Sequence, residues 1–258
     1  MFIDSHCHLN NERLLNQLDD VLARADQAEV KRMVCVSWDF ASSATAVLLS
    51  QRPQIFASIG VHPESGAEWT PEIEQALADL YTASKSRIVA YGEIGLDYHW
   101  ETVDRIHQRE VFLQQLQFAE RLRPDLPVIV HCREAYDDTI ATLREANVSN
   151  PIIMHCFTEG TAICKKVLDA GCIIGIGGVV TYKKSHELRE AAAMIPSDRM
   201  LIETDCPYLP PQPMRGKTNE PSFIPIIAET LAGIRGVSVD ALATETTANA
   251  NRIFNFTT

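Results

Sequence analysis

Residues 127–133 read Pro127-Val128-Ile129-Val130-His131-Cys132-Arg133, a short apolar run that ends in a histidine. A segment of helical period follows from Ala135 to Ala146, and the next apolar run ends near His155. A short buried strand, then a helix, then another buried strand is typical of a parallel sheet with crossover helices. This stretch therefore predicts an α/β fold.

The same alternation repeats along the whole chain. Predicted strands end near His6, Val36, Ile59, Glu93, His131, His155, Ile176 and Glu203. Predicted helices cover Glu12 to Ala28, Pro71 to Ala83, Asp104 to Leu122, Ala135 to Ala146, Thr161 to Ala170, Pro221 to Arg235 and Val239 to Phe254. Eight such units in about 250 residues is the size of a (β/α)8 TIM-type barrel. We therefore predict one barrel domain over residues 1–258.

An open, doubly wound sheet shows the same alternation and is the structural alternative. Its usual G-x-G-x-x-G signature does not follow the first predicted strand. The glycine-rich stretch Gly175-Ile176-Gly177-Gly178 lies at the seventh predicted strand. A tight barrel turn explains that stretch as well as a phosphate-binding loop would.

Composition narrows the class of protein. Hydrophobic residues make up 46% of the 258 residues and charged residues 22%, which argues against disorder and coiled coils. No apolar run reaches the roughly 18 residues of a membrane-spanning helix, so we expect no membrane association. Seven cysteines without a C-x-x-C pair, and a start at Met1 without a secretory pattern, predict a reduced, cytoplasmic protein.

Metal-binding residue types gather at the predicted strand ends. His6 and His8 lie two residues apart, so the period of a strand sends both side chains to one face. Further donors at strand ends are Glu93, His131, His155 and Asp205. Active sites of TIM barrels are built at the carboxyl ends of the strands. Four imidazoles and two carboxylates can hold two divalent cations if one carboxylate bridges them, so we predict a metal site at this end.

The motifs follow one another in a specific order: Asp4-Ser5-His6-Cys7-His8, Gly60-Val61-His62-Pro63, Gly92-Glu93-Ile94-Gly95-Leu96-Asp97, residues 127–133, His155-Cys156-Phe157, residues 203–208 (ETDCPY) and residues 215–221 (RGKTNEP). With these motifs the sequence resembles the TatD family of metal-dependent hydrolases, a branch of the amidohydrolase-like barrels. The resemblance covers nearly the whole chain.

The resemblance implies the role of each donor. One metal ion is expected on His6, His8, Glu93 and Asp205, and the second on Glu93, His131 and His155, with Glu93 as the bridge. The ions are expected to be Mg²⁺, Mn²⁺ or Zn²⁺. Two such cations can activate a water molecule and polarise a phosphoryl oxygen, which favours a deoxyribonuclease or related phosphodiesterase. Glu93 and Asp205 are the expected catalytic residues, with Asp205 as general base.

Further residues are expected to support catalysis. Glu203 either fixes the tautomer of a histidine or forms a structural ion pair. His62 resembles a family residue that positions substrate, and the alternative is a loop histidine that caps a helix. Arg133, Arg215 and Lys217 lie in loops after the fifth and eighth predicted strands, where they are expected to bind substrate phosphates.

Charge limits the substrate. The chain carries 23 Lys and Arg against 34 Asp and Glu, a net charge of −11, which opposes the binding of a long duplex. Single-stranded DNA or short oligonucleotides are therefore the expected partners, and no protein partner is predicted. Tyr98, Trp100 and Tyr208 lie near the predicted strand ends and either stack on bases or pack the loops.

Other functions and other ligands stay open. The same activated water could hydrolyse a C–N or ester bond, as in an amidohydrolase or an aminoacyl-tRNA deacylase. A metal-bearing scaffold for a protein partner is the third hypothesis, although a complete ligand set argues against it. Four cysteines adjoin the expected ligands, namely Cys7, Cys132, Cys156 and Cys206. Strand alternation points them away from the ligands, which favours packing over metal binding.

Overall fold

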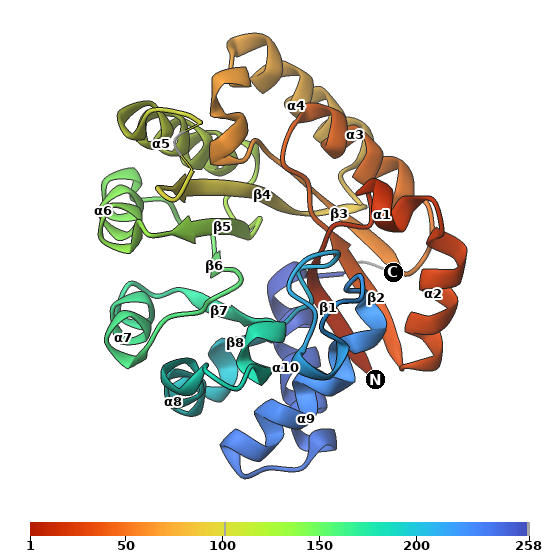
Figure 1. Ribbon diagram of the computed structural model, residues 1–258. Helices are drawn as coiled ribbons and strands as arrows, with labels where there is room; N and C mark the ends of the chain where they lie inside the picture. The colour runs from red at the N-terminus through yellow and green to blue at the C-terminus, as the bar shows by residue number, and fades with distance from the viewer. Residues whose placement is uncertain (101, 257–258) are drawn as a thin grey trace. The chain divides into compact units, whose positions relative to one another are not determined.

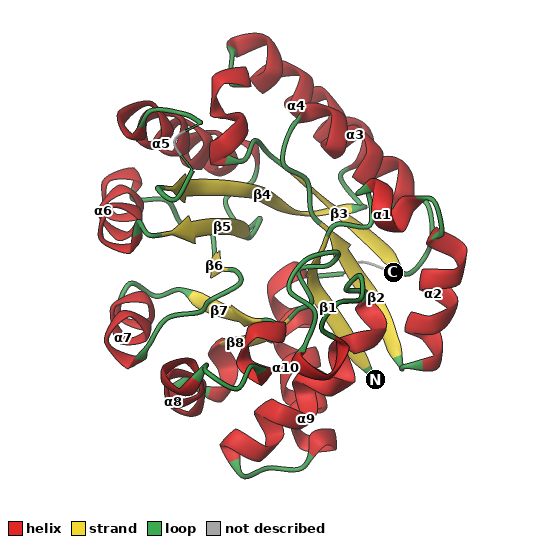
Figure 2. Ribbon diagram, in the orientation of Figure 1, coloured by secondary structure: helices red, strands yellow, loops and turns green. Residues whose placement is uncertain are grey.

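The computed structural model describes residues 1–100 and 102–256. These residues form two compact units, one of Met1–Cys35 and Cys156–Asn255, the other of Val36–His155 with Phe256. Strands and helices alternate along the chain in both units (Figures 1 and 2). The predicted alternation of strand and helix is therefore present in the described residues.

The first unit contains four parallel strands. These are β1 (Phe2–Cys7), β2 (Val30–Cys35), β7 (Ile173–Ile176) and β8 (Met200–Ile202). Strand β1 pairs with β2, β7 pairs with β8, and a parallel bridge between Cys7 and Cys206 joins β1 to the segment after β8. Its helices are α1 (Glu12–Leu15), α2 (Leu18–Gln27), α7 (Thr161–Asp169), α8 (His186–Met194), α9 (Ile224–Arg235) and α10 (Val239–Phe254).

The second unit contains the other four strands, in the order β3-β4-β5-β6. They are β3 (Ile55–Ile59), β4 (Ile88–Asp97), β5 (Val128–Arg133) and β6 (Ile152–Met154), and all three pairs are parallel. Helix α3 (Phe40–Leu49) precedes β3. Helices α4 (Pro71–Ser84), α5 (Arg105–Leu122) and α6 (Tyr136–Ala146) connect the four strands in order, and α5 and α6 lie outside β4 and β5 (Figure 1). All ten residues of β4 are buried, as expected for a parallel sheet covered on both faces.

Capping residues set where the helices begin. Asp39 and Ser42 form a capping box at the start of α3, and the Thr70 hydroxyl accepts a hydrogen bond at the start of α4. The Asp104 carboxylate caps α5 in the same way. Each cap fixes the residue at which a helix begins. It therefore also fixes where the loop from the carboxyl end of the preceding strand stops.

The predicted helix over Glu12 to Ala28 is two helices in the structure. Helix α1 ends at Leu15 and α2 starts at Leu18, while Gln17 has non-helical backbone angles. The Gln17 side-chain amide donates to the Arg13 carbonyl at 3.0 Å, which is the acceptor that the Gln17 backbone N–H would need in a continuous helix. That N–H instead donates to the Leu14 carbonyl, so the helix breaks.

Strand β4 extends beyond Glu93, near which the sequence predicts its end. It continues to Asp97 because two glycines with positive φ, Gly92 and Gly95, keep the backbone against β5. A Cβ atom at Gly95 would overlap the His131 carbonyl. Asp97 is therefore held at the same end of the sheet as Glu93.

Short 3₁₀ segments occupy several loops. They are Pro63–Glu68, Gly178–Thr181, Ser197–Arg199, Gln212–Met214 and Pro221–Phe223. The last of these replaces the first turn of the helix predicted from Pro221. Among the described residues, no single helix combines the length and apolarity of a membrane span; residues 221–235 and 239–254 reach those values only as a pair bent by 107°.

Candidate metal centre

Three metal-binding side chains converge in the first unit. The Nε2 atoms of His6 and His8 lie 3.2 Å apart. Asp205 Oδ1 lies 3.6 Å from His6 Nε2 and 3.4 Å from His8 Nε2. The three side chains are buried or nearly so. We call His6, His8 and Asp205 the first donor set.

Backbone hydrogen bonds between β1 and the segment after β8 hold this set. The Asp205 N–H donates to the His6 carbonyl at 2.9 Å, and the His8 N–H donates to the Cys206 carbonyl at 2.8 Å. Asp205 has a φ of 56°, in the left-handed region that aspartate adopts more readily than most residues. This turn of the backbone brings the carboxylate to the two imidazoles.

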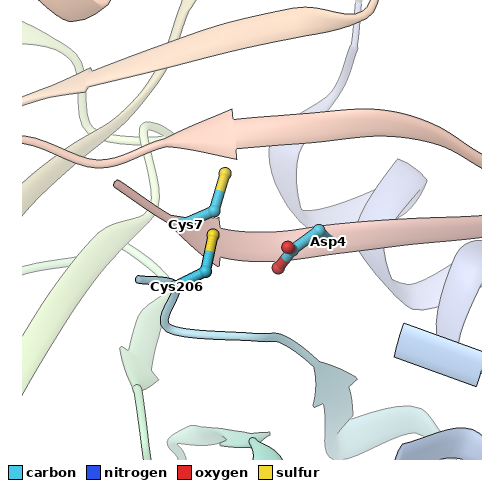
Figure 3. A group of neighbouring side chains, drawn as sticks. All are labelled: Asp4, Cys7 and Cys206. Atoms are coloured by element: carbon cyan, nitrogen blue, oxygen red, sulfur yellow. The ribbon is translucent and has the colours of Figure 1, made fainter. Parts of the chain in front are cut away.

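The neighbouring side chains of Asp4, Cys7 and Cys206 also carry possible metal ligands, but they are engaged in packing. Asp4, Cys7 and Cys206 are fully buried and their donor atoms lie within 4.8 Å of one another (Figure 3). The Asp4 carboxylate accepts hydrogen bonds from the backbone N–H and hydroxyl of Thr204, at 3.0 and 2.6 Å. Burial raises the pKa of the Cys7 thiol well above its usual value. Asp4 thus ties β1 to the segment after β8, and Cys7 stays a packed thiol.

Three further donors converge in the second unit. Glu93 Oε1 lies 2.9 Å from His131 Nδ1 and 2.7 Å from His155 Nε2, and the two histidine nitrogens are 3.3 Å apart. The Glu93 side chain is almost fully buried. We call Glu93, His131 and His155 the second donor set.

Asp97 orients His131, a role that the sequence analysis did not assign. Its Oδ2 lies 2.9 Å from His131 Nε2, opposite the Nδ1 that faces Glu93. Burial opposes ionisation, but the hydrogen bond and charge of His131 outweigh it and lower the pKa of Asp97 to about 2. An ionised Asp97 places the ring proton on Nε2 and leaves the Nδ1 lone pair for a metal ion. Strand periodicity could have predicted this role, because Asp97 lies four residues after Glu93 and therefore shares its strand face.

His62 caps a 3₁₀ segment and also faces Glu93, while its role in positioning substrate stays a prediction. Its Nδ1 accepts the Glu64 backbone N–H at 3.2 Å and caps the 3₁₀ segment, while its Nε2 lies 3.6 Å from Glu93 Oε1. Burial, together with the neighbouring His131, lowers the pKa of His62 to about 3. His62 is therefore a neutral imidazole whose proton is on Nε2, facing the second donor set.

Two buried glutamines of α5 hold the loops of this set. Gln115 accepts from the Val61 N–H and donates to the Val61 carbonyl, at 3.0 and 2.8 Å, which fixes the residue before His62. Gln108 bonds the Asp97 backbone in the same two-way manner, at 2.8 Å each. Their spacing of seven residues places both on one face of the helix. The sequence analysis missed them because a buried glutamine has no distinct pattern in sequence.

Glu203 is fully buried and bonds the backbone after His155. Its Oε1 accepts the Cys156 N–H at 2.5 Å, and the Ser5 hydroxyl lies 3.4 Å from Oε2. A Cβ atom at Gly175 would overlap this carboxylate, so part of the glycine-rich stretch makes room for Glu203. Both roles considered for Glu203, tautomer control and a structural ion pair, stay predictions.

The predicted phosphate-binding residues are all exposed. Arg215 and Lys217 lie in the loop after β8 as predicted, but the loop position predicted for Arg133 was wrong, because Arg133 is the last residue of β5. Arg133 lies over the Trp100 ring, 5.6 Å from its centroid, and Arg215 lies over Tyr182 at 5.0 Å. Lys217 is exposed in the same loop as Arg215. The end of that loop is anchored, because Asn219 Nδ2 donates to the carbonyls of Thr204 and Tyr208, at 2.7 and 2.6 Å.

The geometry of each donor set fits a divalent cation. Ligands about 2.0–2.1 Å from a tetrahedral zinc ion lie roughly 3.3–3.4 Å from one another. The donor atoms within the two sets lie between 2.7 Å (His155 to Glu93) and 3.6 Å (His6 to Asp205) apart. Burial acts against protonation of His131, but the hydrogen bonds with Asp97 and Glu93 prevail and raise its pKa. The residues present can therefore hold metal.

A family model described as TatD related DNase matches residues 3–255. The chain belongs to this family. Among its TatD relatives, the metal-dependent hydrolase YcfH of Escherichia coli K12, described as uncharacterized, is 40% identical over 258 residues, 98% of this chain and 95% of that protein. A 3'-5' ssDNA/RNA exonuclease TatD from Salmonella typhimurium is 36% identical over 97% of this chain and 98% of its own length.

Comparison with a solved TatD structure confirms the fold class. The TatD homologue YjjV of Escherichia coli K12 matches with a TM-score of 0.92 at 27% identity, covering 98% of each chain. The predicted α/β fold, a (β/α)8 TIM-type barrel, is therefore confirmed. As a member of the TatD family, the chain is a metal-dependent hydrolase.

Proposed function

We propose that this TatD-family hydrolase cleaves phosphodiester bonds in nucleic acid, as a deoxyribonuclease that acts on single strands or on strand ends. The observation that carries the proposal is the presence of two compact donor sets, His6, His8 and Asp205 in one unit and Glu93, His131 and His155 in the other. A TatD relative named as an ssDNA/RNA exonuclease supports the same reaction and adds RNA as a second substrate to test.

Two divalent cations are proposed, one per donor set, with Glu93 as the bridging carboxylate. Such a pair, when bound, lowers the pKa of a water molecule and stabilises the charges of an in-line displacement at phosphorus. Mixed imidazole and carboxylate donors are compatible with Mg²⁺, Mn²⁺ or Zn²⁺. The bridging role follows the ligand scheme that the TatD resemblance implies, and Glu93 Oε1 lies within 3 Å of both histidines of the second donor set.

The protein side chains supply proton transfer and orientation. Asp205, whose Oδ1 faces two histidines, is the proposed general base for the attacking water. His62 is neutral and keeps its proton on Nε2, so it can donate a hydrogen bond to a substrate oxygen. Glu203 holds the backbone at Cys156 and thereby supports the neighbouring His155.

Substrate phosphates are proposed to bind Arg133, Arg215 and Lys217. All three side chains are exposed; Arg133 is the last residue of β5, and Arg215 and Lys217 lie in the loop that follows β8. Three cations on an otherwise acidic chain suit a short single strand better than a long duplex. A reducing, cytoplasmic location and the lack of a protein partner stay predictions.

The decisive experiment combines metal analysis with two substitutions. We expect about two divalent ions per chain in protein purified without chelator, and cleavage of labelled single-stranded DNA. Glu93→Ala and Asp205→Ala should each lower kcat/KM at least about a thousandfold, because the acting groups of a catalytic unit are strongly interdependent.

The matched control is Asp79→Ala, which removes an exposed carboxylate from α4. It should retain the metal content and activity of the parent protein. Wild-type activity in Glu93→Ala or Asp205→Ala would refute the assignment. Turnover of cyclic amides or aminoacyl esters in place of DNA would instead support the C–N or ester hydrolase.

A further inference from the structure

Tyr208 is a large aromatic side chain that stays 46% exposed although both of its ends are held. Asn11 Nδ2 donates to the Tyr208 hydroxyl at 3.2 Å. The Tyr208 N–H donates to the Asp205 carbonyl at 3.0 Å, and its own carbonyl accepts from Asn219 at 2.6 Å. Because the ring is already fixed, it loses little conformational freedom when a flat group stacks on it.

The ring lies directly against the first donor set. Its centroid is 6.1 Å from that of His8, and the two planes meet at 70°, so the contact with His8 is edge-to-face. Arg13 Cζ is 6.0 Å from the Tyr208 centroid, at the outer limit of a cation–π contact. The Arg13 side chain is itself exposed. A planar ligand at this position would therefore meet a fixed aromatic ring, an exposed guanidinium and a neighbouring metal donor.

We propose that Tyr208 forms a stacking subsite for one nucleobase of the substrate, an inference that rests on the proposed nuclease function. A nucleotide carries its base one sugar away from its phosphate, so a phosphate at the first donor set brings a base to the adjoining ring. Stacking on an aromatic ring accepts any base, because every base has a π-face. The subsite is therefore expected to bind a base without sequence specificity.

The subsite is tested with two substrates that differ only in their bases. One is a short single-stranded oligodeoxynucleotide and the other is the same phosphodiester chain built from abasic residues. The parent protein should prefer the first by about 5- to 150-fold in kcat/KM, equivalent to roughly 1–3 kcal/mol for one stacked base. Tyr208→Ala should remove most of this preference, whereas Tyr208→Phe, which keeps the ring, should retain it.

Leu209→Ala is the matched control, because Leu209 is the next residue in the same loop and is 38% exposed. It should keep the preference of the parent protein. An undiminished preference in Tyr208→Ala would overturn the proposal, and so would an equal loss on both substrates, which would assign Tyr208 to loop support.

Failure of this inference is separable from failure of the proposed function. If the parent protein cleaves neither substrate, the nuclease function fails, and binding then decides the role of Tyr208. In that case the anisotropy of fluorescein-labelled phosphorothioate versions of both chains is measured with Mn²⁺-loaded protein. Tighter binding of the base-bearing chain that is lost in Tyr208→Ala supports stacking, and equal binding of the two chains by the parent protein overturns it.

Discussion

Asp97 and His131 form the pair on which the second donor set depends. The Asp97 carboxylate accepts a hydrogen bond from the Nε2–H of His131, and this leaves His131 Nδ1 unprotonated beside Glu93. The carboxylate also accepts the backbone N–H groups of His99 and Trp100, at 2.9 and 3.2 Å. One side chain therefore sets both the tautomer of a ligand and the path of the loop that follows β4.

Replacement of Asp97 by Asn should separate these two effects. The Asn oxygen can still accept the loop N–H groups, but its amide nitrogen donates to His131 Nε2 and moves the ring proton to Nδ1. We expect a loss of about 10- to 100-fold in metal affinity, as for other partners of metal-bound histidines. Titration of the purified protein with Zn²⁺ against a competing chelator measures the change.

Asp138→Asn is the control for this substitution, because Asp138 is an exposed carboxylate that accepts the Tyr98 hydroxyl at 2.8 Å. Its metal affinity should equal that of the parent protein. Unchanged affinity in Asp97→Asn would contradict the orienting role of Asp97.

Sequence spacing predicts part of the site at this scale. Two-residue spacing explains why His6 and His8 face the same way, and their nitrogens do lie 3.2 Å apart. No spacing rule reaches from His6 to Asp205, about two hundred residues later, because backbone bonds between distant segments determine that contact. The assignment of metal ions to individual ligands stays a prediction.

Strand β4 depends on glycine at the level of the element. Gly95 has a φ of 145°, and a Cβ atom there would overlap the His131 carbonyl on β5. Close approach of the two strands places His131 beside both Glu93 and Asp97. Side-chain volume at Gly95 would separate the strands and disturb the second donor set.

Gly95→Ala should therefore lower the free energy of unfolding by about 2–4 kcal/mol, from backbone strain and overpacking together. Urea denaturation followed by circular dichroism measures it. In Gly233→Ala, a helix-interior substitution in α9 with nothing within 4 Å of the new Cβ, stability should rise by about 0.5–1 kcal/mol. If the two variants were equally stable, the packing argument would fail.

The elements themselves follow closely from local sequence. Predicted helices from Pro71, Asp104 and Val239 start within a residue of α4, α5 and α10, since capping side chains mark those points. The prediction was wrong over Glu12 to Ala28, where a single side-chain bond from Gln17 breaks the helix. It also ended β4 too early, because the sequence does not show that Gly92 and Gly95 adopt a positive φ that keeps the strand paired with β5.

At the level of the whole molecule, net charge sets how strongly salt should affect the proposed binding of a nucleic acid strand. With a charge of −11, the protein repels a polyanion except where cations gather. If Arg133, Arg215 and Lys217 neutralise three phosphates of a single strand, log affinity should fall against log salt with a slope of about −2. Binding should then weaken about 20-fold between 50 and 200 mM KCl, which fluorescence anisotropy with a labelled oligonucleotide measures.

Removal of one of these cations should flatten the salt dependence. Lys217→Ala is expected to reduce the slope by about 0.7, the share of one phosphate of a single strand. Lys165→Ala removes an exposed lysine from α7 and should leave the slope unchanged. Equal slopes in Lys217→Ala and the parent protein would exclude Lys217 as a phosphate contact.

The sequence alone determined the α/β class, the TIM-type barrel and the TatD family. Strand–helix alternation, capping residues and ordered motifs are local properties that can be recognised without knowing any tertiary contact. The fold comparison and the family model agree with the fold and family predicted from them. One domain over residues 1–258 stays a prediction. Only the tertiary structure decided the role of Asp97, the two glutamine supports of α5 and the exposed, anchored ring of Tyr208. Each depends on a hydrogen bond or on solvent exposure set by chain segments far apart in sequence, which no local pattern encodes.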